Sequence, residues 1–199
     1  MTSARGTMTS AGNRFTVLQR SLHWLMAVCI LAMLFIGVGM NSTVMPKYVP
    51  LLVTHKTLGA IILVLALIRL AVRLRYGAPP LPADLPEPMK VGAHLSHYAL
   101  YLLMIAMPLL GLTMQWTGAY PIVLYGDIRL PTLLPQSDAM HTLLWDAHFY
   151  LAFAFFAVIL LHVAAALFHA LVRRDVVFES MAPTPSHDTP TAVRATHAE

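Results

Sequence analysis

Four long runs of apolar residues constrain this 199-residue chain more than any other feature of its sequence. They cover roughly residues 22–40, 51–72, 95–116 and 146–172, and each is close to the ~20 residues that an α-helix needs to cross the hydrocarbon core of a bilayer. Only 11% of the residues are charged, whereas about a quarter are charged in a typical soluble domain. We therefore expect an all-α fold, a transmembrane four-helix bundle.

The segments that flank this bundle have a different composition. Residues 1–13 are small and polar, and residues 182–199 are rich in Pro, Thr and Ala, so we expect both to be disordered. The compact membrane domain is expected over residues 14–181. Its first apolar run is long enough to span a membrane, which favours a retained helix over a cleaved signal peptide.

The basic residues predict how the bundle is oriented. Cytoplasmic loops carry an excess of Lys and Arg, and both termini lie on the same side of a four-helix bundle. If that side is cytoplasmic, it holds most of the basic residues of the chain: Arg5, Arg14, Arg20, Arg69, Arg73, Arg75, Lys90, Arg173, Arg174 and Arg194. The opposite side holds only Lys47, Lys56 and Arg129. We expect both termini in the cytoplasm.

Histidines at membrane depth are the main functional signal. His148 and His162 lie in the last apolar run, 14 residues apart. At about 100° and 1.5 Å per residue, they share one helix face and stand ~21 Å apart along the axis. They are too far apart to bind one metal ion together, so the spacing predicts two separate sites at two depths. Ionisable residues within a membrane span by default suggest function.

Each site finds a second histidine on another helix. His23 starts the first run at the depth of His162, and His55 starts the second run at the depth of His148. Two imidazoles per iron give a six-coordinate haem that transfers electrons. Cys29 is the single cysteine, so such haems must be bound without thioether links. Zinc is the competing metal, in a histidine-lined transporter, although it prefers more ligands than two.

Residues around these sites suit a flat macrocycle that carries carboxylates. Gly37 lies at the outer level and Gly59 lies one turn after His55, where a missing side chain leaves room. Arg69 and Arg73 lie at the inner level and are natural partners of the haem propionates, or else ordinary membrane anchors. Phe155, midway between His148 and His162, would keep the layer between two haems dry.

Other histidines have less defined roles. His94 and His97 share a face at the cytoplasmic end of the third run, where propionate binding, a proton path and an ordinary surface position remain open. His141 is expected in the loop before the fourth helix. Gly111, with Pro108 before it, is interpreted as a close helix contact beside a kink.

Several motifs, taken in order, resemble the bacterial cytochrome b561 family. They are QRSLHW, THKTLG, RLAVRLRY with two prolines downstream, AHLSHYALYLL, and the pattern H-x13-H-V-A-A-A-L-F-H. The similarity runs from about residue 14 to residue 182. It implies a bacterial inner-membrane protein with two stacked, non-covalent b haems. The family's axial ligands fall on the paired histidines: His23 with His162, and His55 with His148.

Within that family, the chain is similar to the small members described as superoxide oxidases. The resemblance implies electron transfer from periplasmic superoxide through both haems to ubiquinone. Lys47, Lys56 and Arg129 are then candidates for attracting the superoxide anion. His169, on the face of His162, is the expected quinone contact, with Ser21 as a second candidate.

The alternative is a haem b anchor without an enzymatic reaction of its own. Such an anchor relays electrons between quinone and a partner dehydrogenase, hydrogenase or soluble cytochrome. Helices and ligands would be the same in both cases. The sequence predicts contact with the lipid bilayer and gives no indication of nucleic-acid binding, and it leaves the oligomeric state open.

Overall fold

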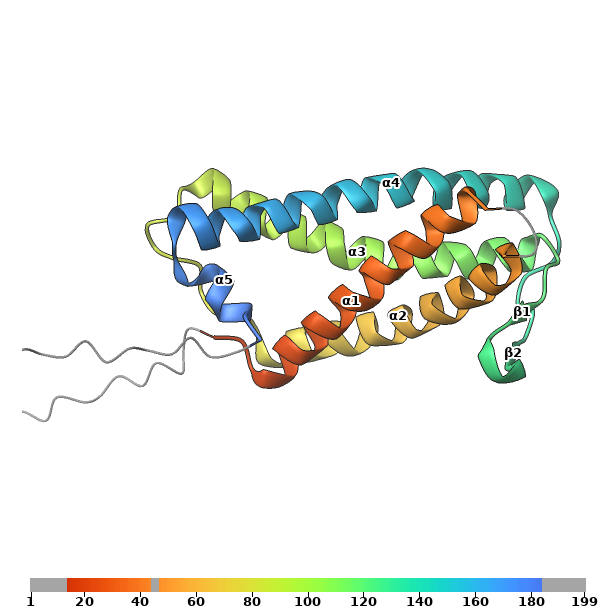
Figure 1. The fold of residues 1–199 in the computed structure, drawn as a ribbon, viewed down its shortest axis with the longest axis horizontal. Helices are drawn as coiled ribbons and strands as arrows, with labels where there is room; N and C mark the ends of the chain where they lie inside the picture. Colours follow the sequence, from red (N-terminus) through yellow and green to blue (C-terminus); the bar gives the residue numbers. More distant parts are fainter. Residues whose placement is uncertain (1–13, 44–46, 184–199) are drawn as a thin grey trace, which may run out of the picture.

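Four long helices form the bundle in the computed structural model, which describes residues 14–43 and 47–183. They are α1 (Val17–Asn41), α2 (Tyr48–Tyr76), α3 (Glu87–Thr117) and α4 (Asp138–Phe168). They run lengthwise in alternating directions, and the chain enters and leaves at the same end (Figure 1). The predicted disordered segment 1–13 lies outside the described residues. The same holds for residues 184–199 of the predicted disordered segment 182–199.

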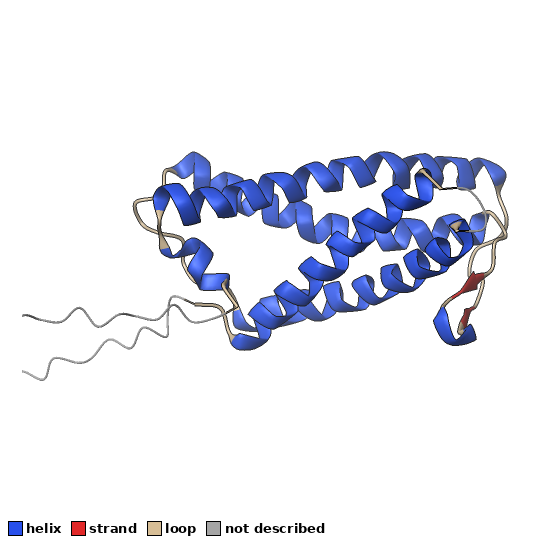
Figure 2. Ribbon diagram, viewed as in Figure 1, coloured by secondary structure: helices blue, strands red, loops and turns tan. Residues whose placement is uncertain are grey.

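The expected all-α architecture is confirmed. Four helices are long and apolar enough to cross a membrane. Large apolar side chains cover their outer faces, with Phe35 78% exposed and Leu161 64% exposed, as lipid contact requires. Figure 2 shows that helices make up nearly all of the regular structure. Two short strands are the only β-structure within the described residues.

Several helices extend further than the apolar runs that predict them. α3 begins at Glu87, since Pro86 and Pro88 occupy its first positions, where proline costs no hydrogen bond. α4 begins at Asp138, where the side chain of Ser137 accepts a hydrogen bond from the Met140 amide. The placement of His141 in a loop is therefore wrong: it lies in the first turn of α4.

The core of the bundle lies midway along the helices. Met26, Ala66, Leu103 and Met107 form it together with Phe155, which is only 8% exposed. α3 packs along α4, α1 packs along α2, and α2 packs on α3, whereas neither α1 nor α2 packs closely along α4. α1 and α4 diverge towards the end that carries the chain termini (Figure 1).

We call this end the terminal end, and a short helix after α4 lies across it. α4 continues into one π-helical turn, His169–Arg173, and Arg174 reverses the chain with a φ of 53°. α5 (Val176–Met181) then leads back to α1, where the Trp24 indole donates to the Met181 carbonyl at 2.9 Å. α5 thus joins the end of α4 to the start of α1.

The other end, here the hairpin end, carries β1 (Ile122–Val123) and β2 (Arg129–Leu130). These strands pair antiparallel around the 3₁₀ turn η2 (Tyr125–Asp127). The Tyr125 hydroxyl lies 2.6 Å from Oγ1 of Thr54, and its amide donates to Oγ1 of Thr57 at 3.1 Å. The loop is therefore held over the start of α2 by these two hydrogen bonds.

Candidate functional site

A pair of histidines meets inside the hairpin end. His55 of α2 and His148 of α4 face each other with ring centroids 6.1 Å apart and ring planes at 66°. Imidazoles that share one metal ion, with bonds of about 2 Å, need ring centres about 6 Å apart. The Nδ1 atoms of both rings are buried and have no hydrogen-bond partner of ordinary geometry among the described residues. The spacing of this pair would allow both imidazoles to bind one metal ion.

Gly111 of α3 makes room for the His148 ring. A Cβ atom at position 111 would lie 3.5 Å from Cε1 of His148. The sequence interpretation had Gly111 in a helix contact; the structure shows that the contact is with the paired histidine. A Cβ at Gly37 would meet nothing within 4 Å, which leaves open space, while one at Gly59 would lie 3.7 Å from Cε of Met33.

A second pair lies near the terminal end. His23 of α1 and His162 of α4 have ring centroids 6.3 Å apart, with the planes at 70°. His97 of α3 also approaches His162, at 5.6 Å. His162 therefore has two neighbours at a distance that fits a shared metal ion, and sequence reasoning considered only His23 as its partner.

Helix packing separates these two neighbours. A flat macrocycle between two ligands requires space between the helices that carry them. α3, which carries His97, packs along α4, whereas α1, which carries His23, diverges from α4 at this end. His23 therefore faces His162 from a helix that does not pack closely along α4, whereas His97 approaches His162 from one that does.

Of the two arginines predicted at this level, Arg69 lies beside the terminal-end pair and Arg73 lies beside His97. The Arg69 guanidinium is close enough to interact electrostatically with His23 and His162. Its Nε donates to the Tyr101 hydroxyl at 3.3 Å, but Nη1 is buried and has no partner among the described residues. Arg73 is close enough to interact electrostatically with His97, and its Nη1 donates to the Gly77 carbonyl at 3.4 Å.

The unpartnered Nη1 atom is informative because a buried donor without an acceptor costs about 1–3 kcal/mol. A carboxylate from a bound group would satisfy it, and guanidinium pairs with carboxylate especially well. The donor set of two imidazoles and one arginine thus fits a metal macrocycle that carries carboxylates. Groups of three or more metal-binding side chains, as zinc prefers, do not occur within the described residues.

His169 lies at the end of α4 and is only 8% exposed. Its Nδ1 is 2.7 Å from Oδ2 of Asp175, which also accepts from Nε of Arg173 at 2.9 Å. Burial opposes ionisation of this carboxyl, but the hydrogen bonds from His169 and Arg173 outweigh it and lower the pKa of Asp175. Sequence analysis identified His169 but not its carboxylate partner.

Ser21 occupies a different place. It is exposed and lines a cleft of about 220 Å³ with Val17, Arg20, Trp24 and Pro183. Asp175, next to His169, precedes α5, whereas Met181 at the other end of α5 contacts Trp24. The two predicted quinone contacts therefore lie near opposite ends of α5, and His169 does not line the cleft of Ser21.

Residues 14–184 match the family model of the prokaryotic cytochrome b561, which covers most of the chain. The protein belongs to the prokaryotic cytochrome b561 family. It is therefore a multi-pass protein of the inner membrane that binds b-type haem and transfers electrons. The similarity to the bacterial cytochrome b561 family seen in the motifs is confirmed.

Relatives of known name support the same assignment. The chain is 31% identical to "Probable superoxide oxidase CybB" of Yersinia pestis, over 85% of this chain and 96% of the relative. It is 27% identical to "Cytochrome b561 homolog 2" of Escherichia coli (strain K12), over 90% of this chain and 97% of the relative. "Cytochrome b561 homolog 1" of the same strain is 28% identical, over 86% and 98%.

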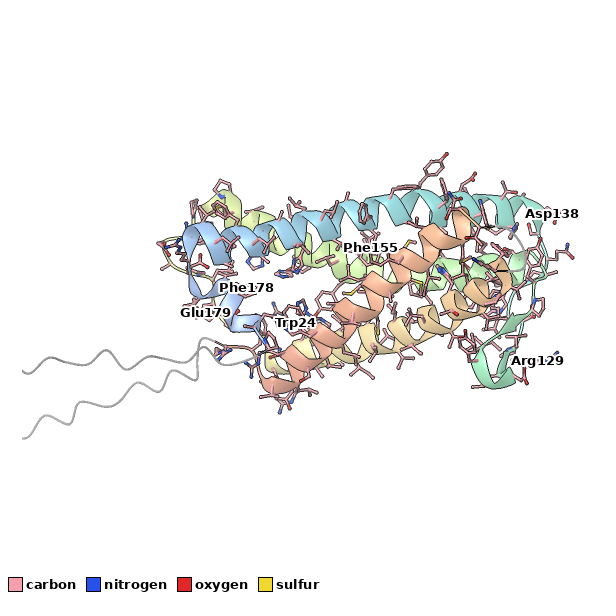
Figure 3. All side chains as sticks on the ribbon, viewed as in Figure 1. Trp24, Arg129, Asp138, Phe155, Phe178 and Glu179 are labelled. Carbon is pink, nitrogen blue, oxygen red and sulfur yellow. The ribbon has the colours of Figure 1, made fainter. Side chains whose placement is uncertain are left out.

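The three cations predicted for superoxide lie on separate parts of this cytochrome b561. Lys56 follows His55 in α2, and its Nζ donates to the Pro121 carbonyl below the hairpin at 3.4 Å. Lys47 is the exposed N-cap of α2, and Arg129 is exposed on β2 (Figure 3). Of these three cations, only Lys56 directly follows a paired histidine in the sequence.

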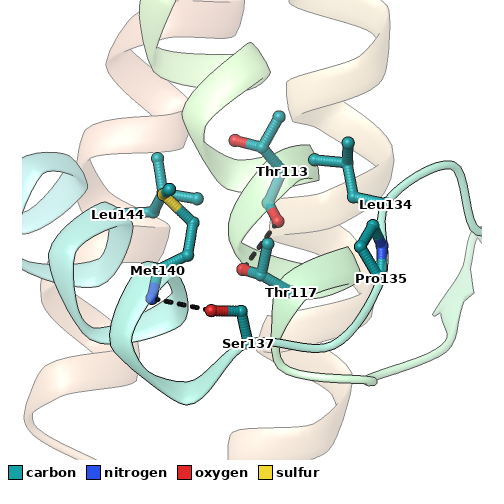
Figure 4. A pocket seen from close by; sticks show the side chains of 7 residues that line it. All are labelled: Thr113, Thr117, Leu134, Pro135, Ser137, Met140 and Leu144. Carbon is teal, nitrogen blue, oxygen red and sulfur yellow. Dashed lines mark hydrogen bonds between the residues drawn. The ribbon is translucent and has the colours of Figure 1, made fainter.

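A pocket of about 380 Å³ at the hairpin end lies between α3, α4 and the loop before α4 (Figure 4). Its walls are mainly apolar, and its hydroxyl groups are engaged locally: Thr117 donates to the Thr113 carbonyl at 3.0 Å, and Ser137 accepts from the Met140 amide. None of the paired histidines lines it. The pocket is therefore separate from both candidate haem sites.

Proposed function

We propose that this cytochrome b561 is a dihaem oxidoreductase that takes electrons from periplasmic superoxide and delivers them to ubiquinone near the cytoplasmic surface. One observation carries the proposal. Two histidine pairs, at opposite ends of the bundle, have ring centroids 6.1 and 6.3 Å apart, which suits one metal ion between each pair.

His55 and His148 would hold the haem at the hairpin end, and His23 and His162 the haem at the terminal end. When bound between two imidazoles, haem iron supplies reversible one-electron transfer without a vacant position for oxygen. Arg69 offers its unpartnered Nη1 to a propionate, with Arg73 nearby. Gly37 leaves open space at the hairpin end, and Gly59 has no side chain between α1 and α2. Phe155 would exclude water between the two sites.

The hairpin end is proposed to face the periplasm. Eight of the 11 basic residues in the described part of the chain lie towards the opposite side, which favours that side as cytoplasmic. Superoxide is a small anion, so Lys56 beside His55 would raise its local concentration, with longer-range contributions from Lys47 and Arg129. The similarity to a relative named as a probable superoxide oxidase supports this choice of substrate.

Ubiquinone is proposed to bind at the terminal end beside His169. This ring is buried, lies two helical turns after His162, and carries a nitrogen that can exchange a proton with a quinone oxygen. Ser21 lines its own cleft at the other end of α5 and is the weaker candidate. It would contact a different portion of the quinone from the one that His169 contacts.

Stopped-flow mixing of the oxidised, haem-loaded protein with superoxide tests this function. Haem reduction should be much faster than in a matched mixture that contains superoxide dismutase. Lys56→Gln should slow the bimolecular step severalfold at low ionic strength, because the local attraction is removed, whereas Arg129→Gln, on the exposed hairpin, should change it less.

Haem reduction no faster than in the dismutase control would reject superoxide as the donor. In that case the relay function would remain, and the protein should instead exchange electrons with quinol and a co-purifying dehydrogenase, hydrogenase or soluble cytochrome. Addition of ubiquinone to the reduced protein tests the other half of the reaction, since reoxidation should follow within the same mixing experiment.

A further inference from the structure

The contact between His169 and Asp175 defines the protonation geometry of the proposed quinone site. We propose that Asp175 is a positioning residue that fixes His169 with its proton on Nδ1, so that Nε2 is the atom that exchanges protons with the quinone. The inference rests on the proposed function only for the assignment of His169 to quinone. The hydrogen-bond geometry stands independently of it.

The tautomer follows from the donors around one oxygen atom. Oδ2 of Asp175 lies 2.9 Å from Nε of Arg173, which can only donate, and 2.7 Å from Nδ1 of His169. Oδ1 of the same carboxyl accepts from the Val177 amide at 3.1 Å. An ionised carboxylate is an acceptor only, so Nδ1 must carry the hydrogen. A neutral His169 then presents an unprotonated Nε2.

The backbone at the end of α4 brings Asp175 back to this ring. In a continued α-helix, a residue six positions on would lie about 9 Å further along the axis. Here the π-helical turn His169–Arg173 and the left-handed Arg174 reverse the chain, and the Asp175 amide donates to the His169 carbonyl at 3.3 Å. Single π-helical turns often occur at functional sites.

A second ion pair of Arg173 lies outside this contact, at the surface. Nη2 of Arg173 lies 2.7 Å from Oδ2 of Asp84, whose side chain is 76% exposed, whereas those of His169 and Asp175 are 10% and 14% exposed. The exposed Asp84 thus pairs with Arg173 from the solvent side, whereas the shielded Asp175 faces the His169 ring. The shielded contact is the stronger one, because water screens the outer pair.

The chemistry needs such a proton donor. Reduction of one quinone to quinol takes up two electrons and two protons; two superoxide anions supply the electrons and leave as two molecules of oxygen. Each proton passes from the imidazolium Nε2 of His169 to a quinone oxygen, and cytoplasmic water returns a proton to the ring. The Asp175 carboxylate stabilises the imidazolium by charge and orients Nε2 towards the acceptor.

The first test follows haem reoxidation by a short-chain ubiquinone after chemical reduction with dithionite, so it needs no superoxide. Asp175→Asn keeps the cap of α5 but removes the charge, and it should lower the maximal rate by about tenfold to a hundredfold with little change in KM. Asp175→Glu should recover part of the rate. Asp84→Asn, the matched control, should stay within about twofold of the wild type.

A maximal rate of Asp175→Asn equal to that of the wild type, with both haems retained, would overturn the proposal. So would an equal loss in Asp84→Asn, since the effect would then belong to the surface ion pair. If the reduced wild type itself is not reoxidised by ubiquinone, the quinone assignment in the proposed function fails, and the tautomer is decided by the second test.

The second test reads the proton directly, without any substrate. Nitrogen-15 NMR of histidine-labelled, dithionite-reduced protein, with the His169 signals assigned from His169→Gln, should show hydrogen on Nδ1 and none on Nε2 when the ring is neutral. Asp175→Ser keeps a capping side chain but is too short to reach the ring, and should shift hydrogen to Nε2. A neutral wild-type ring with its proton on Nε2 would refute the proposal.

Discussion

Enlarging Gly111 should remove one haem and leave the other. A Cβ atom at this position would lie 3.5 Å from Cε1 of His148, which is ordinary van der Waals contact. Gly111→Ala should therefore keep both haems and stabilise α3 by up to about 1 kcal/mol, the difference in helix propensity. Leucine adds three more carbons, with bonds of about 1.5 Å, and the gap cannot hold them. Its cost as overpacking is about 1–3 kcal/mol.

The assay is the ratio of haem to protein, measured as pyridine haemochrome on purified variants. Gly111→Leu must displace the His148 ring from its position opposite His55, so the ratio should fall from about two to about one. The matched control is Gly92→Leu in the same helix, where an added Cβ meets nothing within 4 Å. It should keep the wild-type ratio.

Two haems with an unchanged spectrum in Gly111→Leu would refute the reasoning, because the His148 ring would then keep its position beside a leucine side chain. Loss of both haems in Gly92→Leu would show that the ratio reports general damage to α3. Gly111→Ala is a second control, since it changes the helix propensity at this position but adds no carbon beyond Cβ next to His148.

Three further predictions follow from the packing of the bundle. His97→Ala should retain both haems by the same haem-to-protein assay, because the proposed partner of His162 is His23, and His97 lies on α3, which packs along α4. Arg69→Met should lower the midpoint potential of one haem by on the order of 50 mV in a redox titration, because a nearby positive charge favours the reduced iron. Phe155→Ala should cost roughly 3–5 kcal/mol in an SDS unfolding titration, because the ring is only 8% exposed in the core.

Sequence reasoning reached the fold and the histidine pairs because both depend on regular geometry. Membrane thickness sets the length of each apolar run, and helical periodicity sets the depth and face of His148 and His162. Antiparallel helices then bring His23 and His55 to the matching depths. The structure places these rings opposite each other without any further assumption about tertiary packing.

The features that sequence reasoning missed depend on contacts between elements. His97 approaches His162 only because α3 packs along α4, and a lone histidine at a helix end gives no sign of such a neighbour. The helix contact predicted at Gly111 is present, but nothing in the sequence indicated that its neighbour on α4 is the paired His148.

Irregular backbone accounts for one of the remaining differences. Asp175 follows a left-handed residue, and the hydrophobic pattern, which extends only along regular helices, could not bring it back to His169. The start of α4 was missed for a different reason: Asp138, His141 and Thr142 lie before the long apolar run, so His141 was assigned to a loop. It lies in the helix, where its Nδ1 is 2.9 Å from the Met114 carbonyl at the end of α3.

The most direct test of the whole account is the haem content of His148→Ala and His162→Ala, measured with reduced-minus-oxidised spectra. Each single variant should retain one low-spin b haem, with a spectrum that differs between the two, and the double variant should retain none. Two haems in either single variant, or one haem in the double variant, would contradict the assignment of these histidines as ligands at opposite ends of the bundle.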